Sequence, residues 1–268
     1  MIRFTKAHAY GNDFLYVRTD GISPAALSPL AVEMCDRHTG IGADGLIVYR
    51  AAGNGVTMQL FNADGGTAEI SGNGVRGLAA LLLQHDENPE AQIIIQTAAG
   101  PKTLTRVARE ETRHLFRAEM GAPKDVKQSS IDVGEHSVEA VTLNIGNPHC
   151  VLLGPLPDAP RFAALGAGLE RHKAFSKGTN VEFAHVETPD RVRALIWERG
   201  VGPTTSSGTG SCAVLIAAHA FGGAAREAEV ITPGGSQRVE WKTDGVYLTG
   251  WAEVLCEGDW LRQIPRTF

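Results

Sequence analysis

The chain has 268 residues, with 25 Lys or Arg against 30 Asp or Glu and a net charge of −5. An apolar share of 43% excludes a disordered chain, and the mildly acidic balance argues against binding nucleic acid or an anionic membrane through a basic patch. Glycine is over-represented, since 31 glycines make up roughly 12% of the chain against about 7% in an average protein.

Taken in order, the sequence predicts short strands interrupted by a few helices. Helical spacing predicts a helix over 24–38, with a proline near its start and Gly40 after its end. A compact apolar run predicts a second helix over 75–84, and the polar stretch 124–130 is interpreted as a connector. β-branched and alternating apolar runs predict strands at 2–4, 14–17, 46–49, 56–61 and 93–97.

The two halves of the chain carry the same landmarks in the same order, at an offset of 135 or 136 residues (146 − 11 = 135 and 207 − 71 = 136). Five ordered matches indicate a duplicated domain. We expect one copy at 1–118, completed by the segment near 253–268, and the other at 119–252. The matched pairs are Gly11-Asn12 with Gly146-Asn147, Gly42-Ala43-Asp44 with Gly178-Thr179-Asn180, Phe61-Asn62 with Trp197-Glu198, Ser71-Gly72-Asn73-Gly74 with Ser207-Gly208-Thr209-Gly210, and Thr97-Ala98-Ala99-Gly100 with Thr232-Pro233-Gly234-Gly235.

The strongest local motif is Ser-Gly-Xaa-Gly before an apolar helix, which occurs at 71–74 and 207–210. Glycines let a ligand approach the backbone, and a helix start offers unpaired N–H groups and the positive end of the helix dipole. A carboxylate suits such a position. Each motif alone also fits an ordinary serine N-cap, but two copies, each following a polar strand end at Asn62 or Glu198, favour a binding site.

Polar residues beside the same turns supply groups that recognise an amino acid. Arg199 suits two-pronged capture of a carboxylate, and Glu198 suits an ammonium group. His149 is the one histidine at a repeat landmark. Amide side chains recur next to glycines; each alone fits turn chemistry, but together they would bind a zwitterionic ligand. These amides are Asn12, Asn62, Asn73, Asn147 and Asn180.

Other kinds of site lack their motifs. No His-Glu-Xaa-Xaa-His, Cys-Xaa-Xaa-Cys or carboxylate cluster predicts a metal, and the glycine-rich turns fit neither the dinucleotide fingerprint nor the P-loop. Ser71 and Ser207 lack the Gly-Xaa-Ser-Xaa-Gly pattern of a hydrolase nucleophile. With no apolar signal region at the N-terminus and no apolar stretch long enough for a bilayer, we expect a cytoplasmic protein. The cysteines are too few for a disulfide scaffold: Cys35, Cys150, Cys212 and Cys256.

Over essentially its whole length the chain resembles the diaminopimelate epimerase family, the PLP-independent amino-acid epimerases of lysine and peptidoglycan biosynthesis. Such a series of motifs in order is highly specific for the family. The motifs that carry the resemblance are His8-Ala9-Tyr10-Gly11-Asn12-Asp13-Phe14, Asp36-Arg37-His38-Thr39-Gly40-Ile41-Gly42-Ala43-Asp44-Gly45, Phe61-Asn62-Ala63-Asp64-Gly65, Ser71-Gly72-Asn73-Gly74, Gly146-Asn147-Pro148-His149-Cys150, Asn180-Val181-Glu182-Phe183 and Glu198-Arg199-Gly200.

The resemblance implies a fold of the α/β (α+β) class: two pseudo-symmetric domains, each a mixed, largely antiparallel sheet around a central helix, with the site in the cleft between them. It also implies a homodimer, no cofactor, and inversion of the α-carbon of LL-2,6-diaminopimelate to the meso form by two-base proton transfer. His149 and Glu198 would tune the catalytic groups. Some members carry Gln where this chain has Gly45, so that polar contact is not expected here. Substrate contacts would fall on Asn12, Asn62, Gly72, Asn73, Asn147, Asn180, Glu198, Arg199, Gly208 and Thr209.

The chain departs from the family at the reaction centre, because the family's two catalytic cysteines correspond to Ser71 and Ser207. A thiol has a pKa of about 8.5 and an alkyl hydroxyl is a far weaker acid, a difference on the order of 7–10 kcal/mol in the free energy of deprotonation. A helix N-terminus returns only ~0.3–2 kcal/mol of this. We therefore expect the two-base reaction to be impaired or altered. Cys212 does not replace the thiol at position 207, because it lies beyond the first turn of the helix. Cys150 is only a remote candidate for a catalytic base.

These residues leave three hypotheses, in this order of preference. The first is a diaminopimelate epimerase-like isomerase with serines in both base positions. The second is a racemase, dehydratase or isomerase of the same fold, acting on another small amino or carboxylic acid, with His149 or Glu198 as base. The third is a non-catalytic amino-acid-binding protein that has kept the recognition residues and lost the bases.

Overall fold

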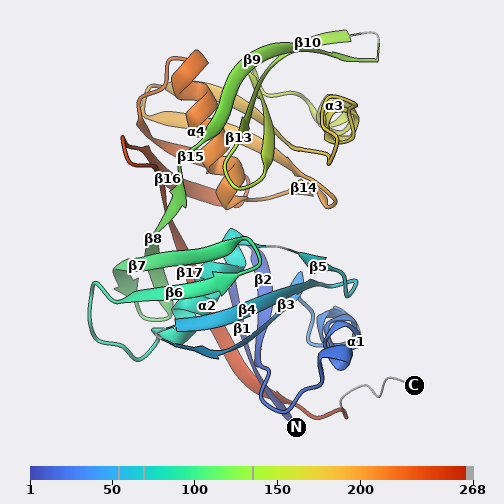
Figure 1. Cartoon of the computed structure of the whole chain (residues 1–268), viewed down its shortest axis with the longest axis vertical. Coiled ribbons are helices and arrows are strands. Elements are labelled where there is room, and N and C mark those ends of the chain that lie inside the picture. The colour runs from blue at the N-terminus through green and yellow to red at the C-terminus, as the bar shows by residue number, and fades with distance from the viewer. Residues whose placement is uncertain (54, 69, 135, 264–268) are drawn as a thin grey trace. The chain divides into compact units, whose positions relative to one another are not determined.

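The computed structural model describes residues 1–53, 55–68, 70–134 and 136–263. The chain divides into two compact units, Met1–Ala118 with Gly250–Phe268, and Glu119–Thr249. Over the described residues, each unit consists mainly of strands with two helices, as Figure 1 shows. The expected mixed α+β fold class is therefore confirmed.

The first unit is built from the elements of residues 1–118 together with the last part of β17 (Val246–Trp260), from Gly250 on. Its helices are α1 (Pro24–Cys35) and α2 (Gly72–Leu82). Its strands are β1 (Ile2–Ala9), β2 (Asn12–Arg18), β3 (Gly45–Ala52), β4 (Gly55–Asn62), β5 (Thr67–Ala68), β6 (Gln92–Thr97), β7 (Gly100–Glu110) and most of β8 (Arg113–Gly121).

The second unit repeats this series of elements. Its helices are α3 (Ala159–Glu170) and α4 (Gly208–Phe221). Its strands are β9 (Lys124–Val133), β10 (His136–Asn144), β11 (Pro148–Leu153), β12 (Asn180–Thr188), β13 (Arg191–Glu198), β14 (Gly202–Thr204), β15 (Glu227–Thr232), β16 (Gly235–Trp241) and the first part of β17 (Val246–Trp260).

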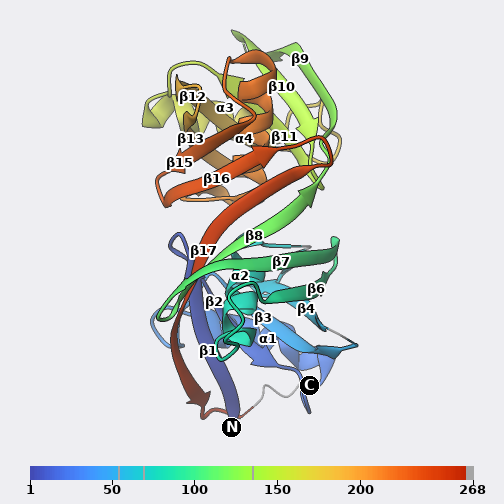
Figure 2. The same cartoon turned by 90° about the vertical axis from the view of Figure 1, so that its left-hand side faces the viewer.

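Strand pairing follows the same order in both units. β1–β2 and β10–β11 are antiparallel, whereas β2–β3 and β11–β12 are parallel and need the crossover helices α1 and α3. β4–β6 and β13–β15 are again parallel, and their connections carry α2 and α4. The end of β17 pairs with β1 (Figure 2), as β9 pairs with β10. This duplicated pairing order agrees with the expected pseudo-symmetric repeat.

The interpretation of 124–130 as a connector is wrong, because these residues belong to β9 and pair with β10. The strand is polar because most of its side chains are exposed, and Ile131 is its one buried residue among those described. The first helix ends at Cys35 rather than 38, where the Asp36 carboxylate accepts hydrogen bonds from the backbone N–H groups of His38 and Thr39.

The central helix of each unit, α2 in the first and α4 in the second, packs against that unit's strands (Figures 1 and 2). The helices α1 and α3 lie on the outer side of the strands. The segment Cys212–Ala218 of α4 is fully buried and belongs to an apolar cluster of its unit, to which strand residues such as Val151 and Val230 also belong. In α2 the corresponding buried segment is Asn73–Ala80. Within the described residues, no helix is long and apolar enough to cross a membrane.

Glycine at the third position of each central helix permits this close packing. A Cβ atom on Gly74 would lie 2.5 Å from the Ile47 Cδ1 atom, and one on Gly77 would lie 2.0 Å from the Tyr16 hydroxyl oxygen. In α4, a Cβ on Gly210 would lie 3.2 Å from both the Glu182 Oε1 and the Ile196 Cδ1 atoms. The repeated glycines therefore mark places where a helix start lies directly on the sheet.

One buried histidine is held neutral by the fold of the first unit. His114 in β8 lies opposite Arg109 in β7 and stacks on Phe116, with the ring centroids 5.9 Å apart. Neither of its ring nitrogens has a hydrogen-bond partner in the part of the chain that the structure describes. Loss of solvation, together with the charges of Arg109 and Arg106, lowers the pKa of His114 to about 4.

Acid should therefore weaken the first unit through His114. Its folded-state pKa of about 4 lies below the ordinary value of 6.5, so the unfolded chain takes up a proton first and stability should fall between pH 6.5 and pH 4. His114→Phe should flatten the pH dependence of the free energy of unfolding in this range, measured by urea denaturation. The exposed-site variant His85→Gln should keep the wild-type slope; an unchanged slope in His114→Phe would contradict this account.

Candidate active site

The first unit places Asn12 at the start of β2 and Asn62 at the end of β4, two strands that lie on either side of β3. Asn12 opens β2 after the tight turn Tyr10-Gly11, whose two residues have φ of 56° and 85° as a type I′ hairpin requires. Asn62 closes β4 in register with Gly45, the first residue of β3. Both amides are half-buried. The hairpin turn and the strand register thus fix where these two predicted residues lie.

A chain of hydrogen bonds connects Asn12 to the start of α2. The Asn12 amide donates to the Asp44 carboxylate at 2.6 Å, and its oxygen accepts from the Asn73 amide at 3.2 Å. The Asn73 oxygen in turn accepts from the buried Arg76 guanidinium at 2.5 Å. The Asp44 carboxylate also accepts from Arg37 at 2.8 Å. The structure therefore brings Asn12 and Asn73 together and adds two charged residues that sequence reasoning missed, Asp44 and Arg76.

The second unit surrounds His149 with polar partners. The Nδ1 atom of His149 lies 2.7 Å from the Glu182 Oε1 atom, and both side chains have 0% exposure. Its Nε2 atom lies 2.8 Å from the Asn147 amide oxygen, and the Asn147 nitrogen lies 3.4 Å from the Thr209 hydroxyl at the start of α4. Burial raises the pKa of the Glu182 carboxyl, opposed by the nearby His149. The predicted residues Asn147, His149 and Thr209 thus lie together.

Asn180 and Arg199 are linked in the same unit. The Asn180 side chain donates to the Pro148 carbonyl at 3.0 Å, and its oxygen accepts the Arg199 backbone N–H at 3.0 Å. The turn after β13 is held from the other side by Glu170, which accepts from the Trp197 indole at 2.8 Å and the Gly200 N–H at 2.9 Å. These bonds fix the Arg199 backbone while its side chain stays exposed.

Both serines cap the central helices. Each has extended backbone angles, and its hydroxyl oxygen accepts the N–H of the glycine three residues on, at 3.1 Å for Ser71 and 3.3 Å for Ser207. The N-cap interpretation therefore holds for both. Ser207 is also hydrogen-bonded to Glu198, whose pKa is raised by burial and by the charge of Glu182, against the effect of the Ser207 bond. Ser207 is therefore in contact with a buried carboxyl as well as with its own helix.

The strand register shows that the two helix starts differ chemically. Phe14 lies opposite Gly45 in the first unit, and His149 lies opposite Asn180 at the same place in the second. Ile47 lies against Gly74, and Glu182 lies against Gly210. A buried imidazole–carboxylate pair therefore occupies positions in the second unit that are apolar in the first.

Three of the four cysteines are buried, and none of these three caps α2 or α4. Cys150 is fully buried in β11, and this burial, with the Glu182 charge, raises the pKa of its thiol to about 12. Cys212 is fully buried inside α4, and burial likewise raises the pKa of Cys35 to about 12. Among the described residues, no group of three or more His, Cys, Asp or Glu side chains could hold a metal ion.

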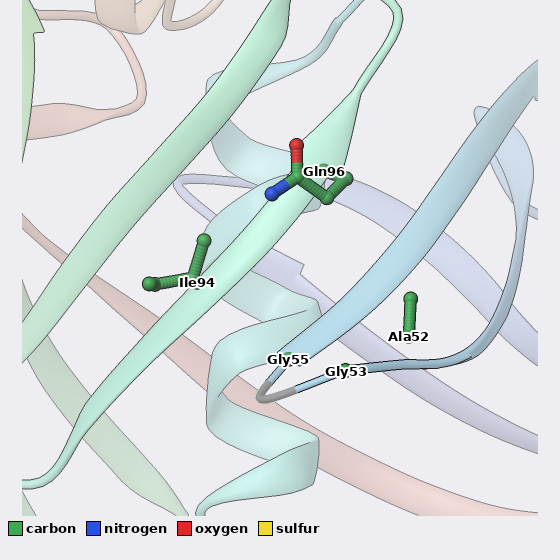
Figure 3. Close-up of a pocket in the computed structure, with 5 residues that line it drawn as sticks. All are labelled: Ala52, Gly53, Gly55, Ile94 and Gln96. Atoms are coloured by element: carbon green, nitrogen blue, oxygen red, sulfur yellow. The ribbon is translucent and has the colours of Figure 1, made fainter.

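A hollow in the first unit is lined by none of these residues (Figure 3). It is lined by Ala52, Gly53, Gly55, Ile94 and Gln96, none of which titrates. Gly55 starts β4 and Asn62 ends it, so the hollow and the Asn62 position are separated by about 23 Å of strand. The predicted polar residues do not line it.

Two of the missed residues, Glu182 and Arg76, carried a signal in the sequence. Glu182 stands between Val181 and Phe183 in a strand that is buried along its first five residues, and an acidic residue within such a run implies a buried partner. Arg76 follows the Ser-Gly-Asn-Gly motif inside an apolar helix in the same way. Nothing local in the sequence shows that Asp44 reaches Asn12, because 32 residues separate them.

Comparison with known proteins gives consistent matches over nearly the whole chain. The family model described as diaminopimelate epimerase matches residues 4–126 and 141–255. The diaminopimelate epimerase of Desulforudis audaxviator is 39% identical, covering 97% of this chain and 100% of that protein; that of Pelotomaculum thermopropionicum is 35% identical, covering 97% and 99%. A solved structure of a probable proline racemase from Agrobacterium radiobacter shares the fold, with a TM-score of 0.73 at 15% identity, over 98% of this chain and 94% of that one.

The buried pair in the second unit gives a test by exchange of residues between the units. Glu182→Ile or His149→Phe alone leaves one buried polar partner unpaired and should cost about 3–5 kcal/mol of unfolding free energy. The double variant, which copies Ile47 and Phe14 of the first unit, should lose far less unfolding free energy than the sum of the losses in the two single variants. Urea denaturation of all four proteins measures this cycle. Single costs below about 1 kcal/mol, or a fully additive double variant, would contradict the pairing.

Proposed function

Because the chain belongs to the diaminopimelate epimerase family and is an isomerase of that kind, we propose that it inverts the α-carbon of LL-2,6-diaminopimelate to give the meso form. The reaction proceeds without a cofactor, in the pathway to lysine. The observation that carries this proposal is the pair of matched helix starts, each with a capping serine, close-packed glycines and the free backbone N–H groups of a first helical turn. Two such starts suit a carboxylate with a reacting carbon beside it.

We assign the recognition residues by type of group. The free N–H groups at Gly72-Asn73 and Gly208-Thr209 bind the carboxylate next to the reacting carbon. The amides of Asn12, Asn62, Asn147 and Asn180, with Glu198 and Arg199, bind the other polar groups of the diamino acid. This set supplies donors for carboxylates and one carboxylate for an ammonium group, which suits a zwitterion.

The proton transfer is assigned to the two capping serines. One hydroxyl, as its alkoxide, removes the α-proton from one face, and the other gives its proton to the opposite face. On the Ser207 side the hydroxyl proton passes to the Glu198 carboxylate, whose raised pKa makes it a stronger acceptor. His149 tunes this side through the buried pair with Glu182. Since hydroxyls are far weaker acids than thiols, the reaction is slow compared with a two-thiol site.

A second candidate function is binding of the amino acid without turnover. The observation that favours it is the same pair of serines, because the recognition groups are intact while the thiols are missing. Turnover of another small amino or carboxylic acid by the same fold is the remaining alternative. We further propose that the protein is a homodimer that works in the cytoplasm, which sedimentation and cell fractionation test.

Restoring the thiols should raise the rate. The Ser71→Cys/Ser207→Cys double variant should convert LL- to meso-diaminopimelate at least 100-fold faster than the wild-type protein, because the 7–10 kcal/mol gap in acidity is removed. Conversion is measured by chiral chromatography of the product. Ser206→Cys, beside Ser207 but bonded to Gln237 instead, is the matched control and should leave the wild-type rate unchanged.

The outcomes separate the candidates. A double variant that turns over diaminopimelate no faster than wild type, while still binding it, would remove the assignment of the serines as the proton-transfer positions. A folded wild-type protein that neither binds nor converts diaminopimelate, and whose double variant also does not, would remove the substrate. Binding without any conversion by the wild-type protein would favour the non-catalytic candidate.

A further inference from the structure

We propose that Asp44 and Arg76 are positioning residues, which lock the Asn12 amide, through Asn73, with an N–H directed at a ligand carboxylate. The first unit then supplies one side-chain N–H of fixed direction to a ligand carboxylate. The identity of the ligand rests on the proposed function, whereas the hydrogen-bond chain itself is independent of it. The four residues come from three parts of the unit: Arg76 and Asn73 from α2, Asn12 from β2, and Asp44 from the loop before β3.

Arg76 and Asp44, at the two ends of this series of hydrogen bonds, determine which group donates and which accepts in every bond between them. An arginine guanidinium can only donate hydrogen bonds, so the Asn73 atom that faces Arg76 at 2.5 Å must be its oxygen. An ionised carboxylate can only accept, so the Asn12 atom that faces Asp44 at 2.6 Å must be its nitrogen. The middle bond, from the Asn73 nitrogen to the Asn12 oxygen at 3.2 Å, satisfies both conditions. Neither amide can turn over without two donors or two acceptors meeting.

Both ends are themselves held in place. The second Asp44 oxygen accepts from Arg37 at 2.8 Å, and the first also accepts the Asp13 backbone N–H at 3.1 Å. Arg76 is 1% exposed, and its guanidinium carbon lies 5.6 Å from the centroid of the Tyr10 ring. A charged group at each end makes the terminal hydrogen bonds stronger than those between neutral groups. The series of hydrogen bonds from Arg76 to Asp44 therefore keeps the same donors and acceptors in the absence of a ligand.

The locked orientation leaves a defined group for the ligand. Asn12 has used its oxygen and one of its two amide N–H groups, so one N–H remains. Asn73 is only 4% exposed, while Asn12 is half-buried, so Asn12 is the amide that a ligand can reach. A remaining N–H suits a carboxylate oxygen and disfavours an ammonium group, which has only donors. Asp44 and Arg76 thus decide the kind of ligand group without touching it.

Calorimetric titration with meso-diaminopimelate tests the effect on binding. Asp44→Asn can donate as well as accept, so it frees the Asn12 amide to turn over and should raise Kd at least 10-fold. Arg76→Met removes the donor and should do the same, whereas Arg76→Lys keeps a donor-only group and should bind within about 3-fold of wild type. Asp190→Asn, which alters an exposed carboxylate hydrogen-bonded to Thr188 in the second unit, is the matched control and should leave Kd unchanged.

A spectroscopic readout keeps the proposal testable even if diaminopimelate does not bind. In protein labelled with ¹⁵N-asparagine, Asp44→Asn should shift the side-chain amide signals of Asn12 and also those of Asn73, which it does not contact; Asp190→Asn should shift neither. Signals are assigned by their loss in Asn12→Asp and Asn73→Asp. Unmoved Asn73 signals in Asp44→Asn would overturn the proposal that hydrogen bonds couple Asp44 to Asn73 through Asn12. Failure of wild-type binding with both signals shifted would count against the proposed function alone, and wild-type Kd in both Asp44→Asn and Arg76→Met would overturn the positioning role.

Discussion

Each unit depends on one constraint: the central helix must start in direct contact with the sheet. The capping serine accepts the N–H of the third helical residue, and that residue is glycine because Ile47 in one unit and Glu182 in the other leave little space for a side chain. The helix that follows is buried, so its start is fixed by the whole core of the unit. The free N–H groups of the first helical residues are thereby held in position to bind an anion.

The duplicated scaffold carries chemically different surroundings at its two helix starts. In the first unit a directed chain of amides ends on Asp44 and Arg76, and the residue under the helix is Ile47. In the second unit, Glu182 lies under the helix instead and forms a buried pair with His149. Symmetric chain topology therefore does not give symmetric proton chemistry, because a few side chains at equivalent positions decide which groups can hold a proton.

The sequence predicted the features that depend on local pattern and on repetition. The duplication and the two helix starts at Ser71 and Ser207 were accessible because glycine and serine mark backbone positions directly, whereas the fold class followed from the family resemblance. The edge strand β9 was missed because exposed strands lack apolar alternation. The contacts of Glu182 and Asp44 could not be predicted, since they join residues 33 and 32 positions apart through the register of strands. The assignment of the site residues to one substrate stays a prediction.

We propose that the protein binds diaminopimelate through its recognition groups while its two serine hydroxyls transfer protons slowly. One ¹H NMR experiment on meso-diaminopimelate with the wild-type protein in D₂O measures both properties together. The account predicts saturation transfer from protein to ligand, which reports binding, and an α-proton signal that decays much more slowly than with the Ser71→Cys/Ser207→Cys protein. Loss of the α-proton as fast as with the two-cysteine protein, or no saturation transfer from a folded protein, would contradict it.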